Sequence, residues 1–202
     1  MSTSRIGTSP IYTNNLGQPI YWINGAPHGT RNEDDTYLLC LHHTQGSDSR
    51  LWLGGDAPNA VSSTYIVGAY PDTNYRPRVY KYMSERTDVP YTQGQGSIGG
   101  LKPNINSHCI SVEVEGPGAI TESAPLGFSP DLLAAVATLC ASIISDWHNA
   151  RGRSLLVIGH DHVDDYRRSG RHTDPHFDWS RVLQMIYTRL PALYGQVKGW
   201  DR

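Results

Sequence analysis

Two apolar runs that each lead into a histidine constrain the fold of this chain more than any other feature. Residues 37–41 run directly into His42, and residues 155–158 run through Gly159 into His160. Short apolar runs of this kind predict buried strands. Because the functional side chains of open α/β sheets lie at the carboxyl ends of strands, we expect both histidines at one sheet edge. Two such histidines and a carboxylate from a loop are the protein ligands of a catalytic zinc site.

The remaining pattern predicts a single α/β domain, in which helices flank a central mixed β-sheet. Strands are expected over residues 36–43, 64–69, 78–82, 108–115 and 154–159. A helix is expected from Ser129, as the N-cap, to about Asn149, because Pro130 suits a first helical position and apolar residues recur at helical spacing. A last helix is expected to end at Pro191.

The sequence divides into two parts by composition. Residues 1–30 are rich in Gly, Pro, Asn and Thr and are predicted to form an irregular N-terminal segment that packs on the body of the domain. Residues 31–202 are predicted to form the catalytic domain. Long loops near residues 44–60 and 83–107 are expected to flank a substrate groove, since long loops in compact domains are usually functional.

Charge, hydropathy and cysteine count exclude several classes of protein. The net charge is -2 without a basic patch, which argues against a nucleic-acid partner. We find no signal peptide at the N-terminus and no apolar run long enough to span a membrane, so synthesis in the cytoplasm is expected. The odd number of cysteines, 3, predicts buried reduced thiols. The chain is expected to be a monomer.

Carboxylates supply the rest of the candidate site. Asp174 follows His160 by 14 residues, on a predicted loop just before a proline, and is the candidate third metal ligand. Glu113 and Glu115 share one face of the predicted strand 108–115. We interpret Glu113 as lying on a solvated face. Glu115, at the end of the strand, can reach the histidines and act as a general base. Only one of His42 and His43 can join the site, because adjacent strand residues point to opposite faces.

Five motifs, taken in order, resemble those of the zinc-dependent N-acetylmuramoyl-L-alanine amidases. This family includes phage lysins, bacterial wall-recycling amidases and animal peptidoglycan-recognition proteins. The motifs are His42-His43-Thr44, residues 62–68, residues 111–115, Gly159-His160 and residues 170–175. The resemblance spans roughly residues 36–190, with motif spacing similar to that of the family.

The resemblance implies a role for each matching residue. His42, His160 and Asp174 correspond to the Zn²⁺ ligands, and Glu115 corresponds to the general base of bacterial members. His172 stands where many members carry a lysine that stabilises the oxyanion, and we expect it to take that role. The implied reaction is hydrolysis of the amide between the lactyl group of N-acetylmuramic acid and L-alanine of the peptidoglycan stem peptide.

Other positions depart from the family pattern and leave the substrate open. Substrate contacts are expected at Thr44, Ser63, Thr64, Tyr65 and His176, although the histidine usual in the second motif is absent and His176 is also a rival ligand. The leading hypothesis is a phage-type lysin that acts on the cell wall. The alternatives are a cytoplasmic muropeptide-recycling amidase, a non-catalytic peptidoglycan-recognition module, and a metal hydrolase for another amide or ester.

Overall fold

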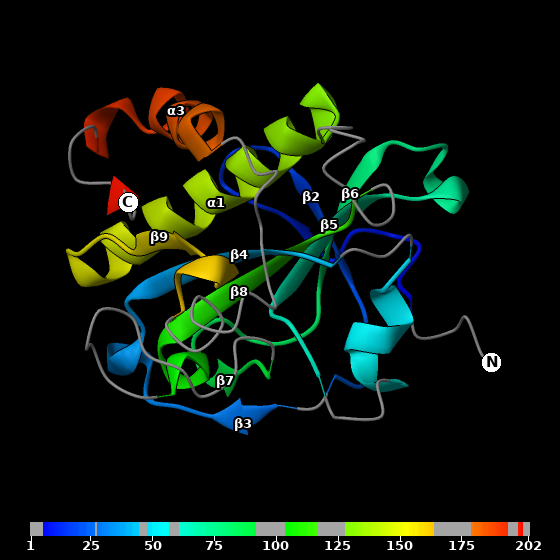
Figure 1. Cartoon of the computed structure of the whole chain (residues 1–202), viewed down its shortest axis with the longest axis horizontal. Helices are drawn as coiled ribbons and strands as arrows, with labels where there is room; N and C mark the ends of the chain where they lie inside the picture. The colour runs from blue at the N-terminus through cyan, green and yellow to red at the C-terminus, as the bar shows by residue number, and fades with distance from the viewer. Residues whose placement is uncertain are drawn as a thin grey trace.

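The structure of the chain is a computed structural model, which describes residues 6–26, 28–44, 48–56, 61–91, 104–116, 128–163, 179–193 and 198–199. Within these residues the centre of the fold is an eight-stranded sheet in the order β1-β2-β6-β5-β8-β4-β9-β10 (Figure 1). Its strands are β1 (Tyr12–Thr13), β2 (Pro19–Trp22), β4 (Leu38–His43), β5 (Tyr65–Ala69), β6 (Pro77–Lys81), β8 (Cys109–Val114), β9 (Leu156–Gly159) and β10 (Lys198–Gly199). The pairs β1–β2 and β5–β6 are antiparallel and the others parallel, so the predicted mixed sheet is confirmed.

The register of three central strands determines where the site lies. β4 lies between β8 and β9 and runs parallel to both. His42 on β4 pairs with Glu113 on β8, and Leu41 pairs with Gly159 on β9. These strands are buried almost throughout, as expected for parallel strands covered on both faces. Their carboxyl ends therefore bring His42, Glu113 and His160 to one edge of the sheet.

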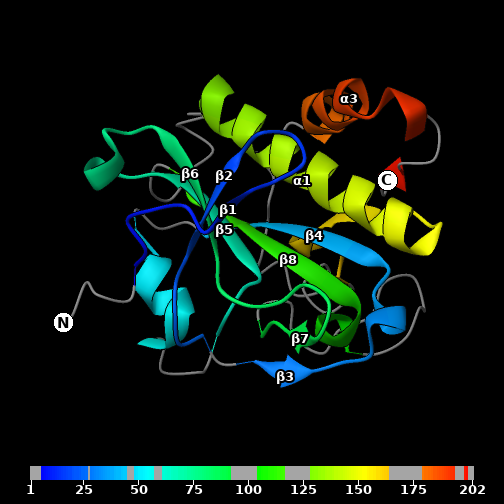
Figure 2. The same cartoon turned by 180° about the vertical axis from the view of Figure 1, so that it is seen from behind.

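Two helices lie on one side of this sheet, one against the sheet and the other on top of the first (Figures 1 and 2). Helix α1 (Pro130–Arg151) begins where the Ser129 hydroxyl accepts a hydrogen bond from the Leu132 N–H at 3.2 Å. It ends at Gly152, whose φ of 65° is the left-handed conformation that favours glycine. Helix α3 (Trp179–Arg189) lies on α1 and ends before Pro191. Both predicted helices are confirmed.

The core has a main part between the sheet and the helices and a second part on the opposite face. The main part joins β4 and β8 to α1 and α3 through residues such as Leu39, Val112, Ile144 and Ile186. On the other face, a π-helical turn, η3 (Trp52–Asp56), packs through Leu53 against Ile66, Tyr70 and Tyr80. This turn lies inside the predicted loop 44–60. The three cysteines are buried reduced thiols, as predicted.

The N-terminal segment is more regular than predicted. β2 extends the central sheet by pairing in parallel with β6, and β1 pairs with β2. The expectation of an irregular segment was therefore wrong for these residues. The strands are only 2 and 4 residues long and lie between turn-forming residues, so their sequence pattern was weak. The division at residue 30 stays a prediction.

Short elements complete the described chain. A separate two-stranded sheet joins β3 (Gly29–Thr30) to β7 (Asp88–Val89). Five 3-10 turns are present, namely η2 (Glu33–Asp35), η4 (Pro71–Thr73), η5 (Ile105–His108), η6 (His160–His162) and η7 (Pro191–Leu193). β7 lies inside the predicted loop 83–107 and η5 begins inside it, so this region is only partly irregular among its described residues.

The expectation that no apolar run is long enough to span a membrane was wrong for helix α1, which by length and composition is the one helix in the described part of the chain that could do so. In the fold, 61% of its most apolar window is buried inside the protein. Leu133, Val136, Cys140 and Ile144 all belong to the main core. The apolar character of α1 is therefore used to cover the sheet, as in the core helix of a globular domain.

Candidate active site

The centre of the candidate site is a contact between His42 and Glu113. Nδ1 of His42 lies 2.9 Å from Oε2 and 3.1 Å from Oε1 of Glu113. Glu113 is 1% exposed, so the interpretation of a solvated face was wrong. The cross-strand register explains the burial, because the imidazole on β4 satisfies a carboxyl group that would otherwise be costly to bury. Sequence alternation alone places Glu113 on a face but does not reveal its partner.

His160 lies beside His42 at the carboxyl edge of the sheet. The two imidazole rings meet edge to face, with their centroids 4.3 Å apart. His160 is the first residue of η6, directly after β9, and its side chain is buried. The η6 turn is closed by His162, whose Nδ1 accepts a hydrogen bond from the Gly159 N–H at 2.9 Å. His162 thus has a structural role that the sequence analysis did not identify.

His43 lies outside this cluster. Its ring packs edge to face on Phe128, with 5.0 Å between centroids, and it is buried beside Gly116. A β-carbon on Gly116 would lie 2.4 Å from Nε2 of His43, so glycine is required there for space. The expectation that only one of the adjacent histidines joins the site agrees with this placement, and the one that meets His160 is His42.

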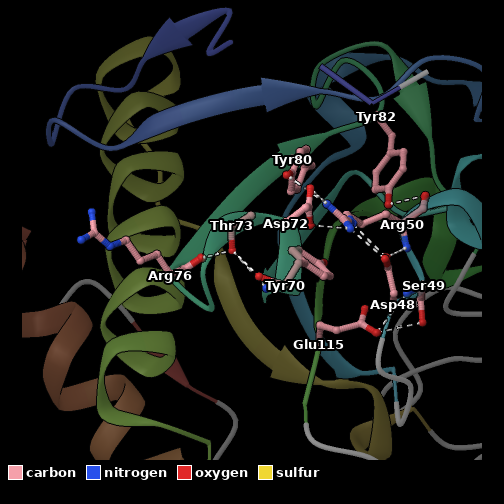
Figure 3. Close-up of polar contacts among 10 residues, drawn as sticks. All are labelled: Asp48, Ser49, Arg50, Tyr70, Asp72, Thr73, Arg76, Tyr80, Tyr82 and Glu115. Carbon is pink, nitrogen blue, oxygen red and sulfur yellow. Dashed lines mark hydrogen bonds and ion pairs between the residues drawn. The ribbon is translucent and has the colours of Figure 1, made fainter. Parts of the chain in front are cut away.

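Glu115 follows β8 directly and is buried near the same edge (Figure 3). Its Oε1 accepts hydrogen bonds from the backbone N–H of Ser49 at 3.0 Å and from the Ser49 hydroxyl at 3.3 Å. Burial above all raises the pKa of Glu115, the two Ser49 hydrogen bonds lower it, and the charges of Asp48 and Glu113 raise it, so that the pKa is about 7. A carboxyl group with a pKa near 7 can take up and release a proton close to neutral pH.

The predicted substrate contacts fall into two groups. Thr44 follows β4 at the edge that carries His42, where its N–H donates to the carbonyl of Val114, and its contact with substrate stays a prediction. Ser63, Thr64 and Tyr65 are at most 1% exposed. The Ser63 hydroxyl is used inside the fold, where it bonds to Ser111 Oγ at 2.9 Å and to the carbonyl of Tyr65 at 2.8 Å. Burial therefore argues against substrate contact for these three residues.

Three predicted site residues, His172, Asp174 and His176, lie outside the described residues. Their expected roles as oxyanion stabiliser, third ligand and substrate contact stay predictions. Among the described residues no group of three His, Cys, Asp or Glu side chains is placed to hold a metal ion. The candidate metal centre in the described part of the chain is therefore the pair His42 and His160.

The chemistry of this pair fits zinc. Imidazole nitrogens are ordinary zinc ligands, and two of them meet here at adjacent strand ends. Metal-binding histidines almost always donate their other ring N–H to an acceptor such as a carboxylate, which orients the ring. Glu113 is such an acceptor for His42. The residues present therefore suit a zinc site that takes a third ligand from elsewhere in the chain.

The fold and the site together define an α/β protein with a histidine and carboxylate site at the carboxyl edge of a mixed sheet. Residues 32–177, more than two thirds of the chain, match the sequence profile of Amidase_2, described as N-acetylmuramoyl-L-alanine amidase. The chain belongs to this family. No curated protein matches the chain in sequence.

Several solved structures are similar in fold, among them the following three. AmiD from E. coli, in complex with the substrate anhydro-N-acetylmuramic acid-L-Ala-D-gamma-Glu-L-Lys, is 25% identical with a TM-score of 0.57, over 75% of this chain and 57% of AmiD. AmpDh3 from Pseudomonas aeruginosa, in complex with an anhydromuramic pentapeptide, is 19% identical with a TM-score of 0.57, over 75% and 60%. A selenomethionine derivative of AmpD is 18% identical with a TM-score of 0.59, over 82% and 93%. The matches thus span about three fifths of AmiD and AmpDh3.

Proposed function

We propose that this protein hydrolyses the amide bond between the lactyl group of N-acetylmuramic acid and L-alanine of the stem peptide. Membership of the amidase family supports the reaction class. The proposal rests on one observation. His42, His160 and Glu113 lie together at the carboxyl edge of the sheet, and Glu115 is buried next to that edge. The similar AmiD and AmpDh3 structures contain anhydromuropeptides, which supports a muropeptide as the substrate class.

In the proposed site, His42, His160 and Asp174 hold Zn²⁺. Zinc in such a site supplies Lewis acidity, which lowers the pKa of water and polarises a carbonyl group. Glu113 orients the ring of His42 through its bond to Nδ1. In this arrangement His42 and His160 bind the metal ion, and Glu113 orients His42.

Proton transfer is assigned to Glu115. In its ionised form Glu115 takes a proton from the attacking water, and it then delivers this proton to the nitrogen of the departing alanine. The raised pKa of Glu115, about 7, suits both steps near neutral pH. His172 is proposed to stabilise the negative charge that develops on the carbonyl oxygen of the lactyl group during the attack of water.

Two substrates fit the proposal and differ in size. A phage-type lysin cleaves polymeric peptidoglycan, which is our leading interpretation, whereas a recycling enzyme cleaves released anhydromuropeptides. Because the AmiD and AmpDh3 structures contain anhydromuropeptides, the test includes a released anhydromuropeptide as the second substrate. Rates on intact peptidoglycan and on a soluble anhydromuropeptide, compared at equal stem-peptide concentration, distinguish these two functions.

The test counts new alanine N-termini against new reducing sugar ends after incubation with each substrate. New alanine amines that disappear with a chelator, return with zinc and are absent with Glu115→Gln support the proposed reaction. Glu33→Gln is the matched control, because Glu33 forms ion pairs with Arg86 and Arg151 away from the site. If the wild-type protein binds the cell wall but releases no new alanine amine, the proposed amidase activity is contradicted and a non-catalytic recognition module is supported.

A further inference from the structure

A cleft of about 330 Å³ lies between the C-terminal half of α1 and the segment that joins β6 to β7. The proposed reaction does not use the residues that line it. They include Glu85, Arg86, Ile143, Asp146, Trp147 and Asn149. The volume is within the usual range of small-ligand sites, so the cleft is large enough to hold a single sugar ring.

The cleft is separate from the histidine cluster at the carboxyl edge of the sheet. The backbone carbonyl of Glu85 accepts a hydrogen bond from Arg31, which also donates to the carbonyl of Cys109. Cys109 begins β8, whereas Glu113 lies near the other end of this strand. At about 3.3 Å per residue, Cys109 and Glu113 are roughly 13 Å apart along the strand. A small ligand in the cleft therefore does not touch His42 or Glu113.

The indole group of Trp147 indicates that the cleft is built for a ligand. Trp147 is 3% exposed, and its Nε1 is buried without a hydrogen-bond partner among the described residues. Buried tryptophan N–H groups usually have an acceptor, because an unsatisfied donor costs free energy. Ile143 lies one turn earlier on the same face of α1 and adds apolar surface to the cleft. Trp147 thus lacks an acceptor that an oxygen of a ligand can supply.

Polar groups of both charges line the rest of the cleft. Oδ1 of Asp146 accepts a hydrogen bond from the Asn15 side chain at 2.8 Å. Burial, and then the charge of Glu85, raise the pKa of Asp146, so a further hydrogen-bond donor would stabilise its ionised form. Glu85 is paired with Lys81, and the half-exposed side chain of Arg86 adds a cationic donor. The cleft therefore offers both donors and acceptors to a ligand.

We propose that this cleft binds a sugar ring of the peptidoglycan glycan strand, as a second contact with the cell wall apart from the site of hydrolysis. Sugar hydroxyl groups both donate and accept, so they can bond to the Asp146 carboxylate and to the Trp147 indole. A metal cation fits less well, because it cannot accept the indole proton and is repelled by Lys81 and Arg86. An anion is repelled by the carboxylates. The choice of wall glycan as the ligand rests on the proposed function.

The first arm of the test measures binding without catalysis. Tri-N-acetylchitotriose is the probe, because it consists of N-acetylated sugars and has no stem peptide for the proposed reaction to remove. In nitrogen-15-labelled protein, the indole N–H resonance of Trp147 is one of 5 and is assigned through its neighbours in the chain. We expect chitotriose to shift this resonance in the wild type. Shifts confined to other tryptophans, or no shift at all, overturn the proposal.

A matched pair of variants tests the polar contact. Asp146→Ala removes a carboxylate acceptor, and we expect it to bind chitotriose about tenfold more weakly than the wild type. Asp131→Ala is the control, because Asp131 is an exposed aspartate on the first turn of the same helix, outside the cleft. Melting temperatures of both variants report loss of folding. Equal affinity of the two variants for chitotriose overturns the proposal.

The second arm relates the cleft to cleavage. On intact peptidoglycan we expect Asp146→Ala to raise KM several-fold without a change in kcat, because a contact that only holds the glycan strand contributes uniform binding. A soluble anhydromuropeptide with a single sugar should be cleaved as by the wild type. An unchanged KM on peptidoglycan, or an equal rise on both substrates, overturns the proposal. Failure of wild-type cleavage contradicts the proposed function instead and leaves the chitotriose result intact, so the two failures are distinguishable.

Discussion

Oε2 of Glu113 lies 2.9 Å from Nδ1 of His42, across the register of two parallel strands. Both side chains are largely buried, with 2% and 15% of their surfaces exposed, so water does not compete freely for the bond. A carboxylate in this position fixes the orientation of the imidazole ring and increases its basicity as a ligand. The site thus contains a support for His42, the proposed metal ligand, as well as His42 itself.

This relationship predicts an effect on metal affinity. Glu113→Ala removes the support, and we expect zinc to bind about 10- to 100-fold more weakly, while Glu113→Gln retains a hydrogen bond and loses less. Competition with a chromophoric chelator measures the affinity. Glu115→Gln is the control, since Glu115 bonds to Ser49 and not to His42. Equal affinity of wild type and Glu113→Ala would show that Glu113 does not support the ligand.

The two adjacent histidines of β4 offer a matched pair for testing metal binding. Zinc that binds only the folded protein raises the melting temperature, by an amount that corresponds to about 2.7 kcal/mol at 100 times Kd. We expect His42→Ala to abolish this rise. His43→Ala is expected to lower the melting temperature, because His43 is buried against Phe128, but to retain the rise with zinc. A zinc response lost in His43→Ala and kept in His42→Ala would reverse the assignment of the ligand.

The sequence predicted those parts of the site that depend on local pattern. Apolar runs ending at His42 and at Gly159-His160 correctly indicated two strands whose carboxyl ends are adjacent. The burial of Glu113 was not predictable in this way, because the alternation of residues along a strand is the same whether its face is exposed to solvent or buried. The burial depends on the contact with His42, which is 71 positions away in sequence and is brought close by the pairing of β4 with β8.

The buried ion pairs of Arg50 with Asp48 and Asp72 were not predicted for a similar reason. Asp48, Ser49 and Arg50 lie in a polar stretch whose composition is that of an exposed loop. Their burial follows from Asp72 and from the tyrosines of β5, β6 and the residues that follow them, which are distant in sequence. No local signal distinguishes an arginine that meets such partners from an ordinary surface arginine.

The buried carboxyl group of Glu115 predicts a pH-dependent cost in stability. Its pKa is raised by burial from 4.5 to about 7 in the folded protein, so the folded state binds the proton more tightly than the unfolded state. Stability is therefore lost as the pH rises from 4.5 through 7. Glu115→Gln cannot ionise and should be more stable than wild type by about 1–3 kcal/mol at pH near 8.

Metal-free protein is the correct material for this comparison, because bound zinc would stabilise both proteins. Chemical unfolding at pH near 8 and again near 4 measures the difference. We expect the advantage of Glu115→Gln to vanish at the acidic pH, where Glu115 is protonated in both states. A variant that is less stable than wild type at both pH values would show that the carboxyl group is not destabilised by burial.

Gly68 on β5 is required for space beside Tyr70 and Glu115. A β-carbon at this position would lie 2.5 Å from the ring of Tyr70 and 2.7 Å from Cβ of Glu115. Gly68→Ala should therefore destabilise the protein by about 1–3 kcal/mol through overpacking and lower kcat by displacing Glu115. Gly152→Asn is the control, because Gly152 has open space around its α-carbon and asparagine tolerates its positive φ. If Gly68→Ala retains both the melting temperature and kcat of this control, the contact of Gly68 with Glu115 does not constrain the site.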